Sequence, residues 1–196
     1  MIEQLPGLEN KRYSVIYADV PWTFKRYSDI DPSRAPEAHY NIMSLDAIKR
    51  LPVAAHANDD CVLLLWACDP LLPVALEVIA AWEFKFATVG FYWAKLNKSG
   101  NGLFTGMGYW TRSNPEQCLL ATRGHPKRQA KNVAKLVQSP RREHSRKPDE
   151  VIGRIERLLD GPYLELFARQ ERPGWDSWGD DTRHFNQPGE DEIRFP

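Results

Sequence analysis

Asp19-Val20-Pro21-Trp22 follows a short apolar segment and combines a carboxylate, a proline turn and an aromatic ring. The exocyclic amine of a base such as adenine is a weak nucleophile, because its lone pair is delocalised into the ring. A carboxylate and a backbone carbonyl that each accept one N–H can direct that lone pair at an electrophile, while a flat side chain stacks on the base. The motif therefore predicts amine chemistry, and an Asp that only caps a turn before a proline is the alternative.

Lys147 stands just before Pro148, at the expected start of a helix. A cation is unfavourable there, because the N-terminus of a helix already carries partial positive charge. An anion bound at this point, such as the carboxylate of a methionine moiety, would explain it. A solvated Lys on a long stem is the alternative.

Glu165 lies in the alternating segment 163–167, which is expected to be a buried strand. A buried carboxylate is costly without a partner, and an acid late in such a strand can accept hydrogen bonds from ribose hydroxyls. Arg169 follows just past the strand, at the same expected crevice. An edge position in contact with water is the alternative.

The elements that must position these residues alternate between strand and helix character. Strands are expected at 13–18, 61–66, 84–93, 117–122 and 163–167. Helices are expected to begin at Ser44, at Asp69 as an N-cap and at Pro148, the last ending at Gly161. This alternation predicts an α/β fold with a mostly parallel sheet and helices on both faces. Ligands of such sheets bind beyond the carboxyl ends of the strands.

The length of 196 residues suits a single domain over 1–196, with a core at about 13–181 and an acidic tail at about 182–196. The three cysteines form no paired framework and no zinc-type cluster, so we expect no metal. No signal peptide or membrane span is recognisable, and a reducing, cytoplasmic location is expected.

The net charge is zero, but residues 123–147 hold nine Lys or Arg and one acid, Glu143. We expect this segment to be a surface loop that contacts phosphates, with a solvated face as the alternative. Flanking bases would be read by loops near 24–40, 96–115 and 124–146. The candidate nucleic-acid contacts are Tyr40, Lys127, Arg128, Arg141 and Arg142.

Taken together, the motifs resemble the MT-A-type adenine-N6 methyltransferases, a family that includes the messenger-RNA m6A writer's catalytic subunit and bacterial and phage DNA enzymes. The resemblance covers about residues 13–181 and its pieces occur in the family's order. They are 18–22, 39–44, 63–66, 91–95, 108–110 with 116–119, 144–150 with 155–158, 165–169, and 174–175 through 178–179.

The resemblance implies a Rossmann-like sheet in permuted motif order, with S-adenosylmethionine as the cofactor. Asp19 and the backbone at Val20 and Pro21 would hold the target amine of a flipped base, and Trp22 would stack on the adenine. Lys147 would meet the cofactor carboxylate. The remaining cofactor contacts implied are Asp19 itself, Glu165, Phe167, Arg169, Asp180 and Asp181.

The chain departs from the family pattern at three points. Val20 replaces the usual first Pro of the catalytic motif, which restores an N–H and some backbone freedom. Asp180 stands where Asn is common, and the segment before Tyr13 is too short to assign the pocket for the cofactor's adenine.

The preferred reading is an adenine-N6 methyltransferase acting on DNA, because a short chain without an RNA-binding module resembles the bacterial and phage members more. An RNA adenine methyltransferase, a catalytically silent binding subunit and an N4-cytosine methyltransferase stay open. So does the assembly, as a homodimer or a heterodimer.

Overall fold

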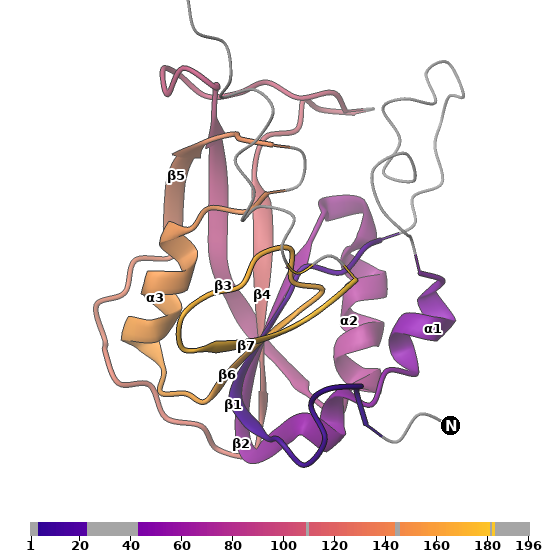
Figure 1. Ribbon diagram of the computed structural model, residues 1–196. Helices are drawn as coiled ribbons and strands as arrows, with labels where there is room; N and C mark the ends of the chain where they lie inside the picture. Colours follow the sequence, from indigo (N-terminus) through magenta and orange to yellow (C-terminus); the bar gives the residue numbers. More distant parts are fainter. Residues whose placement is uncertain (1–3, 23–42, 109, 144–145, 181, 183–196) are drawn as a thin grey trace, which may run out of the picture.

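The computed structural model describes residues 4–22, 43–108, 110–143, 146–180 and 182. In this part of the chain, one sheet has the strand order β5-β3-β4-β2-β1-β6-β7 (Figure 1). The strands are β1 (Tyr13–Ala18), β2 (Ala57–Ala67), β3 (Lys85–Leu96), β4 (Glu116–Arg123), β5 (Leu136–Pro140), β6 (Tyr163–Leu166) and β7 (Trp175–Trp178). All run in one direction except β4, which is antiparallel to both of its neighbours.

Helices cover both faces of the sheet, with α1 and α2 on one side and α3 on the other (Figure 1). Their bounds are α1 (Leu45–Lys49), α2 (Leu72–Ala81) and α3 (Glu150–Leu158), with 3-10 turns η3 (Val53–His56) and η4 (Asp69–Leu71). Successive residues of a strand point to opposite faces, so Ile16 of β1 packs with the α1 and α2 side and Val15 with the α3 side. The expected α/β fold with a mostly parallel sheet is confirmed. No helix within the described residues is long and apolar enough to cross a bilayer.

Two strands were not expected from the sequence. The basic segment was interpreted as a loop, but it contains β5, in which Val137 is buried and Leu136 is half exposed. β7 was also missed, since only its first residue, Trp175, is buried. Both are edge strands of the sheet. Only one face of each strand is covered, so each has too few apolar residues to give a recognisable pattern in the sequence.

Of the expected helix starts, the N-cap at Ser44 is confirmed and the N-cap at Asp69 is wrong. Ser44 caps α1, its side-chain oxygen accepting a hydrogen bond from the Ala47 N–H at 3.2 Å. Asp69 was expected to cap α2, but it lies inside η4 and makes no cap. Its carboxylate instead accepts a hydrogen bond from the Gln117 side chain, because the antiparallel β4 starts beside the end of β2.

The direction of β4 decides which residues meet at the functional edge of the sheet. The parallel strands end there, at Ala18 of β1, Ala67 of β2 and Leu166 of β6. Because β4 runs the other way, its first residue, Glu116, lies at that same edge, and its last, Arg123, lies at the opposite one. We name the edge where β1 ends the carboxyl edge.

A buried histidine fixes the N-terminal segment to the sheet. His56 is fully buried, and its Nε2 accepts a hydrogen bond from the Leu5 N–H at 2.9 Å. Its Nδ1 lies 3.0 Å from the Lys11 carbonyl, so Nδ1 must carry the proton and donate it. The neutral imidazole therefore satisfies two backbone groups that have no partner in regular structure.

Replacing His56 by Ala should lower the free energy of unfolding by about 2 kcal/mol, because a buried N–H loses its acceptor. Urea unfolding followed by circular dichroism measures this. The exposed His125 is the matched control, and His125→Ala should change the free energy by less than about 0.5 kcal/mol. Equal losses in the two variants would contradict the role given to His56.

Candidate active site

Three of the residues singled out from the sequence meet at the carboxyl edge. The Lys147 ammonium donates a hydrogen bond to Asp19 Oδ2 at 2.7 Å, across 128 positions of the chain. Arg169 Nη2 lies 3.6 Å from the same oxygen. Asp19 directly follows β1, Lys147 precedes α3 and Arg169 follows β6, so the topology assembles the group from three separate loops.

Two further members of this charge cluster were not predicted. Glu116 Oε2 lies 3.4 Å from the Lys147 ammonium, and Glu116 Oε1 lies 2.5 Å from that of Lys95. Both residues belong to motifs of the family resemblance, but nothing in their spacing indicates contact. The missing information was the antiparallel direction of β4, which brings Glu116 to this edge.

The cluster is largely closed to solvent, which governs its electrostatics. Burial works against ionisation of Glu116, but Lys147 and Lys95 outweigh it and lower the pKa of that carboxyl. Burial likewise disfavours the Lys147 ammonium, but Asp19 and Glu116 outweigh it and raise the Lys147 pKa above its ordinary value. The charged forms therefore depend on one another.

Trp66, near the end of β2, forms the floor beneath Lys147. The ammonium lies 5.6 Å from the centre of the indole ring, and the indole N–H donates to the Tyr17 hydroxyl at 2.7 Å. The Trp66 carbonyl accepts a hydrogen bond from the Trp22 indole at 3.2 Å. Trp22 is only 7% exposed, so its ring belongs to the core and is not the exposed ring expected from the sequence.

The backbone after Asp19 forms a tight turn. The Trp22 N–H donates to the Val20 carbonyl at 2.8 Å, which closes the chain over Pro21. Val20 is buried in the same core as Trp22, so the side chain that replaces the family's usual Pro contributes to packing. Among the hydrogen bonds of the described residues, none uses the Pro21 carbonyl.

Glu165 lies on β6 in register with Tyr17, and it is 8% exposed. Its burial excludes the edge position in water. Arg172, which was not predicted from the sequence, donates from Nε to Glu165 Oε2 at 2.9 Å. Burial raises the pKa of Glu165 above its ordinary value, and Arg172 and Arg169 oppose that rise.

Asp149, the residue before α3, connects two arginines. It accepts a hydrogen bond from Arg142 at 2.6 Å and lies 3.4 Å from Arg172. Arg142 also donates to the Lys147 carbonyl at 3.0 Å. Burial works against ionisation of Asp149, and the arginines outweigh it and lower the pKa of that carboxyl.

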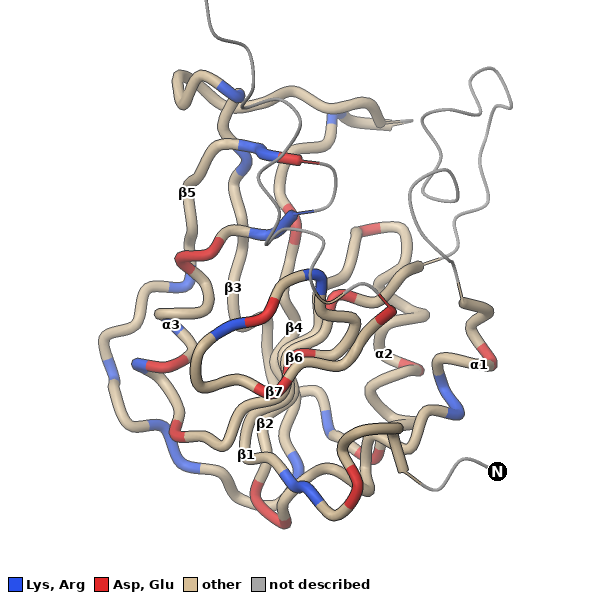
Figure 2. The backbone as a smooth tube through the Cα atoms, in the orientation of Figure 1, with Lys and Arg blue, Asp and Glu red and all other residues tan. Residues whose placement is uncertain are grey.

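The expected nucleic-acid contacts are divided between the two edges of the sheet. Arg141 directly follows β5 at the carboxyl edge, its guanidinium 3.4 Å from the centre of the Phe104 ring. Lys127 and Arg128 follow β4 at the opposite edge, and both are exposed. Figure 2 shows Lys and Arg along the basic segment 123–147, which runs beside the sheet from β4 to β5.

The other expected site residues are more peripheral. Phe167 has a left-handed backbone, with φ 58°, and packs edge-on against Trp178 at 5.6 Å. Asp180 is exposed. Tyr40 and Asp181 lie outside the described residues.

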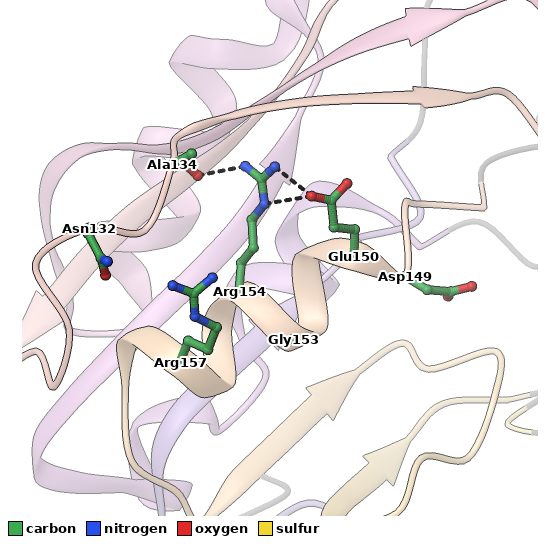
Figure 3. A pocket seen from close by; sticks show the side chains of 7 residues that line it. All are labelled: Asn132, Ala134, Asp149, Glu150, Gly153, Arg154 and Arg157. Carbon is green, nitrogen blue, oxygen red and sulfur yellow. Dashed lines mark hydrogen bonds and ion pairs between the residues drawn. The ribbon is translucent and has the colours of Figure 1, made fainter. Parts of the chain in front are cut away.

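A hollow beside the outer side of α3 is lined by Asn132, Ala134, Asp149, Glu150, Gly153, Arg154 and Arg157 (Figure 3). Arg154 spans it, donating to Glu150 and to the Ala134 and Leu136 carbonyls. Because these bonds occupy the guanidinium, the hollow serves to attach α3 to β5 and contains none of the cluster around Asp19. Within the described residues, no group of three or more His, Cys, Asp or Glu could hold a metal ion.

Replacing Lys147 by Gln should lower the free energy of unfolding by about 3 kcal/mol at pH 7, because two partly buried carboxylates lose a shared cation. The exposed pair Lys49–Glu77, at 2.5 Å, provides the control. Lys49→Gln should cost less than about 1 kcal/mol. Denaturant titration measures both, and equal costs would contradict the dependence of the cluster on Lys147.

The same variant should alter the pH dependence of stability. Because the folded pKa of Glu116 is lowered, its contribution is present above pH 4.5 and is lost as the pH falls through the folded value. In Lys147→Gln that pKa rises toward or above the unfolded value, so the loss of stability between pH 7 and pH 4 should be smaller than in the unaltered protein.

Comparison with known proteins places this arrangement in a family. The MT-A70 family model matches residues 13–181. The type II methyltransferase M.MunI of a Mycoplasma species is 31% identical over 90% of this chain and 81% of its own length. A putative N(6)-adenosine-methyltransferase MT-A70-like protein of Medicago truncatula is 30% identical over 86% of this chain, and the human N(6)-adenosine-methyltransferase catalytic subunit METTL3 is 28% identical over 90%.

The extent of the match differs between these relatives. The chain spans 26% of the Medicago protein and 30% of the human one, against 81% of M.MunI. The family model nevertheless covers all of the sheet and the whole charge cluster around Asp19. The chain therefore belongs to the MT-A70 family of methyltransferases.

Proposed function

We propose that this protein transfers a methyl group from S-adenosylmethionine to the N6 amine of adenine in DNA, with the base turned out of its stack toward Asp19. The observation that carries the proposal is the 2.7 Å contact between Asp19 and Lys147 at the end of β1. It joins the group suited to hold an amine with the group suited to hold a carboxylate. Membership of the MT-A70 family supplies the reaction class.

The residues at the carboxyl edge fit S-adenosylmethionine by their chemistry. The cofactor carries a carboxylate, two cationic centres and a ribose diol, and the edge offers the Lys147 ammonium together with the carboxylates of Asp19 and Glu165. Ser177, in register with Glu165 on β7, has a buried hydroxyl without a hydrogen-bond partner in the described residues. An unsatisfied buried hydroxyl beside a buried carboxylate is consistent with a polar ligand.

When bound, S-adenosylmethionine supplies an electrophilic methyl group on a sulfonium. The protein's part is to position the amine and shape its electron density. The Asp19 carboxylate accepts one amine N–H once Lys147 turns to a ligand carboxylate. A backbone carbonyl of Val20 or Pro21 accepts the other; the Val20 carbonyl also accepts from the Trp22 N–H and has a second lone pair. Asp19 is also a base that can take the proton that the amine must lose.

The preference for DNA rests on the extent of the similarity. M.MunI, a type II methyltransferase, is matched over most of its length, whereas the N(6)-adenosine methyltransferases are matched over less than a third of theirs. An RNA substrate is the alternative, because the groups around Asp19 would recognise an amine and are indifferent to the sugar of the polymer.

Incubation with labelled S-adenosylmethionine and, in parallel, double-stranded DNA, single-stranded DNA and RNA tests the proposal. Nucleoside mass spectrometry of the products should detect N6-methyladenine in DNA. Label in RNA alone would contradict the DNA assignment, and N4-methylcytosine would contradict the base assignment.

In that assay Asp19→Ala should lower the transfer rate by at least about a hundredfold, because the amine loses its charged acceptor. Cofactor affinity, measured by calorimetry, should stay within a few-fold. Asp69 is the matched control, because it is the first residue of η4, lies at the same edge and contacts Gln117. Asp69→Ala should retain most of the activity. Full transfer by Asp19→Ala would remove the proposed role.

Phosphate contacts are proposed for Lys127, Arg128, Arg141 and Arg142, and the fold allows them to be tested separately. Arg142 is held by Asp149, so its replacement would also disturb Lys147. Arg141→Ala should reduce the slope of log affinity against log salt by about 1, because one phosphate contact is lost.

The double variant Lys127→Ala/Arg128→Ala tests the opposite edge of the sheet by the same fluorescence-anisotropy titration. A reduced slope would extend the DNA contact along the whole β4–β5 segment, and an unchanged slope would confine it to the carboxyl edge. An unchanged slope in both variants would contradict the phosphate role of the basic segment.

A further inference from the structure

Arg172 occupies an unusual place between two acids that belong to different parts of the fold. Its Nε donates to Glu165 on β6 at 2.9 Å, and its Nη1 lies 3.4 Å from Asp149 at the start of α3. The side chain is 16% exposed, and that of Glu165 is 11% exposed. A guanidinium suits this bridge because its donors are fixed in a planar fork and it stays charged.

The bridge continues to the Lys147 segment. Asp149 Oδ2 accepts from Arg142 Nη1 at 2.6 Å, and Arg142 Nη2 donates to the Lys147 carbonyl at 3.0 Å. A continuous chain of contacts thus runs from Glu165 through Arg172, Asp149 and Arg142 to Lys147. Its two ends are the residues that the proposed function assigns to the ribose and the carboxylate of the cofactor.

Asp149 and its neighbour Glu150 pair with different arginines. Glu150 pairs with Arg154 on the outer side of α3, whereas Asp149 points away from that pair (Figure 3). Asp149 makes no side-chain cap for α3 either. Its carboxylate is therefore committed to the arginines and not to the helix that it precedes.

We infer that Arg172 is a positioning residue, which holds the Glu165 carboxylate in one orientation and, through Asp149, fixes it relative to Lys147. Only Oε2 of Glu165 is used by Arg172, which leaves Oε1 for a ligand hydroxyl. The two cofactor contacts then form one preorganised unit, although they lie on different loops. The inference rests on the proposed function, because it concerns the binding of the same cofactor.

Arg172 also opposes protonation of Glu165. The groups that face this carboxyl are Tyr17 and Asp19 of the β1 side and Arg169 and Arg172 of the segment after β6. Burial raises the pKa of Glu165 and the Asp19 carboxylate adds to that rise, whereas Arg172 and Arg169 oppose it, so removal of the Arg172 charge raises the pKa further. A raised pKa means that the carboxylate is lost as the pH falls and is recovered as the pH rises.

The test measures S-adenosylmethionine affinity by calorimetry between pH 6 and pH 9, without any methyl transfer. The unaltered protein should vary by less than about threefold over this range, since Arg172 opposes protonation of Glu165. Arg172→Gln should bind about tenfold more weakly at pH 6 and recover most of that loss at pH 9. A purely structural defect would give a loss that high pH does not reverse.

Three further variants make the result specific. In Arg172→Gln/Glu165→Gln the pH dependence should disappear, because the titrating carboxyl is gone. Arg154→Gln removes an arginine of equal exposure, 16%, from the outer side of α3 and should leave the pH profile flat. Arg172→Lys should also give a flat profile, with several-fold weaker binding, because an ammonium keeps the charge but cannot span both acids.

The outcomes separate the two proposals. Failure of the unaltered protein to bind S-adenosylmethionine would overturn the proposed function itself. Normal binding by the unaltered protein, with the same affinity and pH profile in Arg172→Gln, would overturn only the role of Arg172. If Arg172→Gln does not fold, the Lys variant carries the test, and unaltered affinity in that variant would overturn the bridge.

Discussion

The buried ammonium of Lys147, held between the carboxylates of Asp19 and Glu116, is the interaction on which the rest of the site depends. These side chains are only 11% to 21% exposed, and charges so largely shielded from water need partners, since a buried ion left alone is costly. The constraint applies to the fold as well as to the site. The three residues come from the end of β1, the start of β4 and the segment before α3, so the cluster exists only when all three elements are in place. The cluster therefore requires the reversed direction of β4, because a parallel β4 would carry Glu116 to the far edge.

Mutual pairing of the site residues has a consequence for ligand binding. Asp19 and Glu165 each already accept from a cation of the protein, at 2.7 Å and 2.9 Å. If S-adenosylmethionine binds at this edge as we propose, it exchanges these ion pairs for its own. Such an exchange would favour a ligand with both an anionic and a cationic end, because that ligand replaces the pairs that it breaks.

Sequence patterns predicted the parts of this structure that are set by local periodicity. β1 was predicted at its observed bounds, and the apolar faces of α2 and α3 follow from helical spacing. The location of Asp19 at the carboxyl edge followed from the rule that ligands bind beyond strand ends, but its direct ion pair with Lys147 was not predicted. Glu116 and Arg172 were missed for a different reason. Their partners lie on other elements of the fold. The antiparallel pairing of β4 and the path of the chain after β6 bring these partners together, and neither can be inferred from residue spacing. The burial of Trp22 was not predicted, because it depends on a contact with the distant Trp66.

The basic segment shows how the fold assigns different tasks to residues of one kind. From the sequence alone, the nine Lys and Arg residues within residues 123–147 suggest a single phosphate-binding surface. In the structure, β4 ends at one edge of the sheet and β5 ends at the other, so the basic segment, which includes β5, runs from one edge to the other. Arg142 is held by Asp149 and the Lys147 carbonyl, and Lys147 itself is enclosed by acids. Local charge density therefore reflects two demands, the internal pairing of the charge cluster and the attraction of a polyanion that we propose. Only the contacts that each cation makes in the structure show which of the two demands it serves.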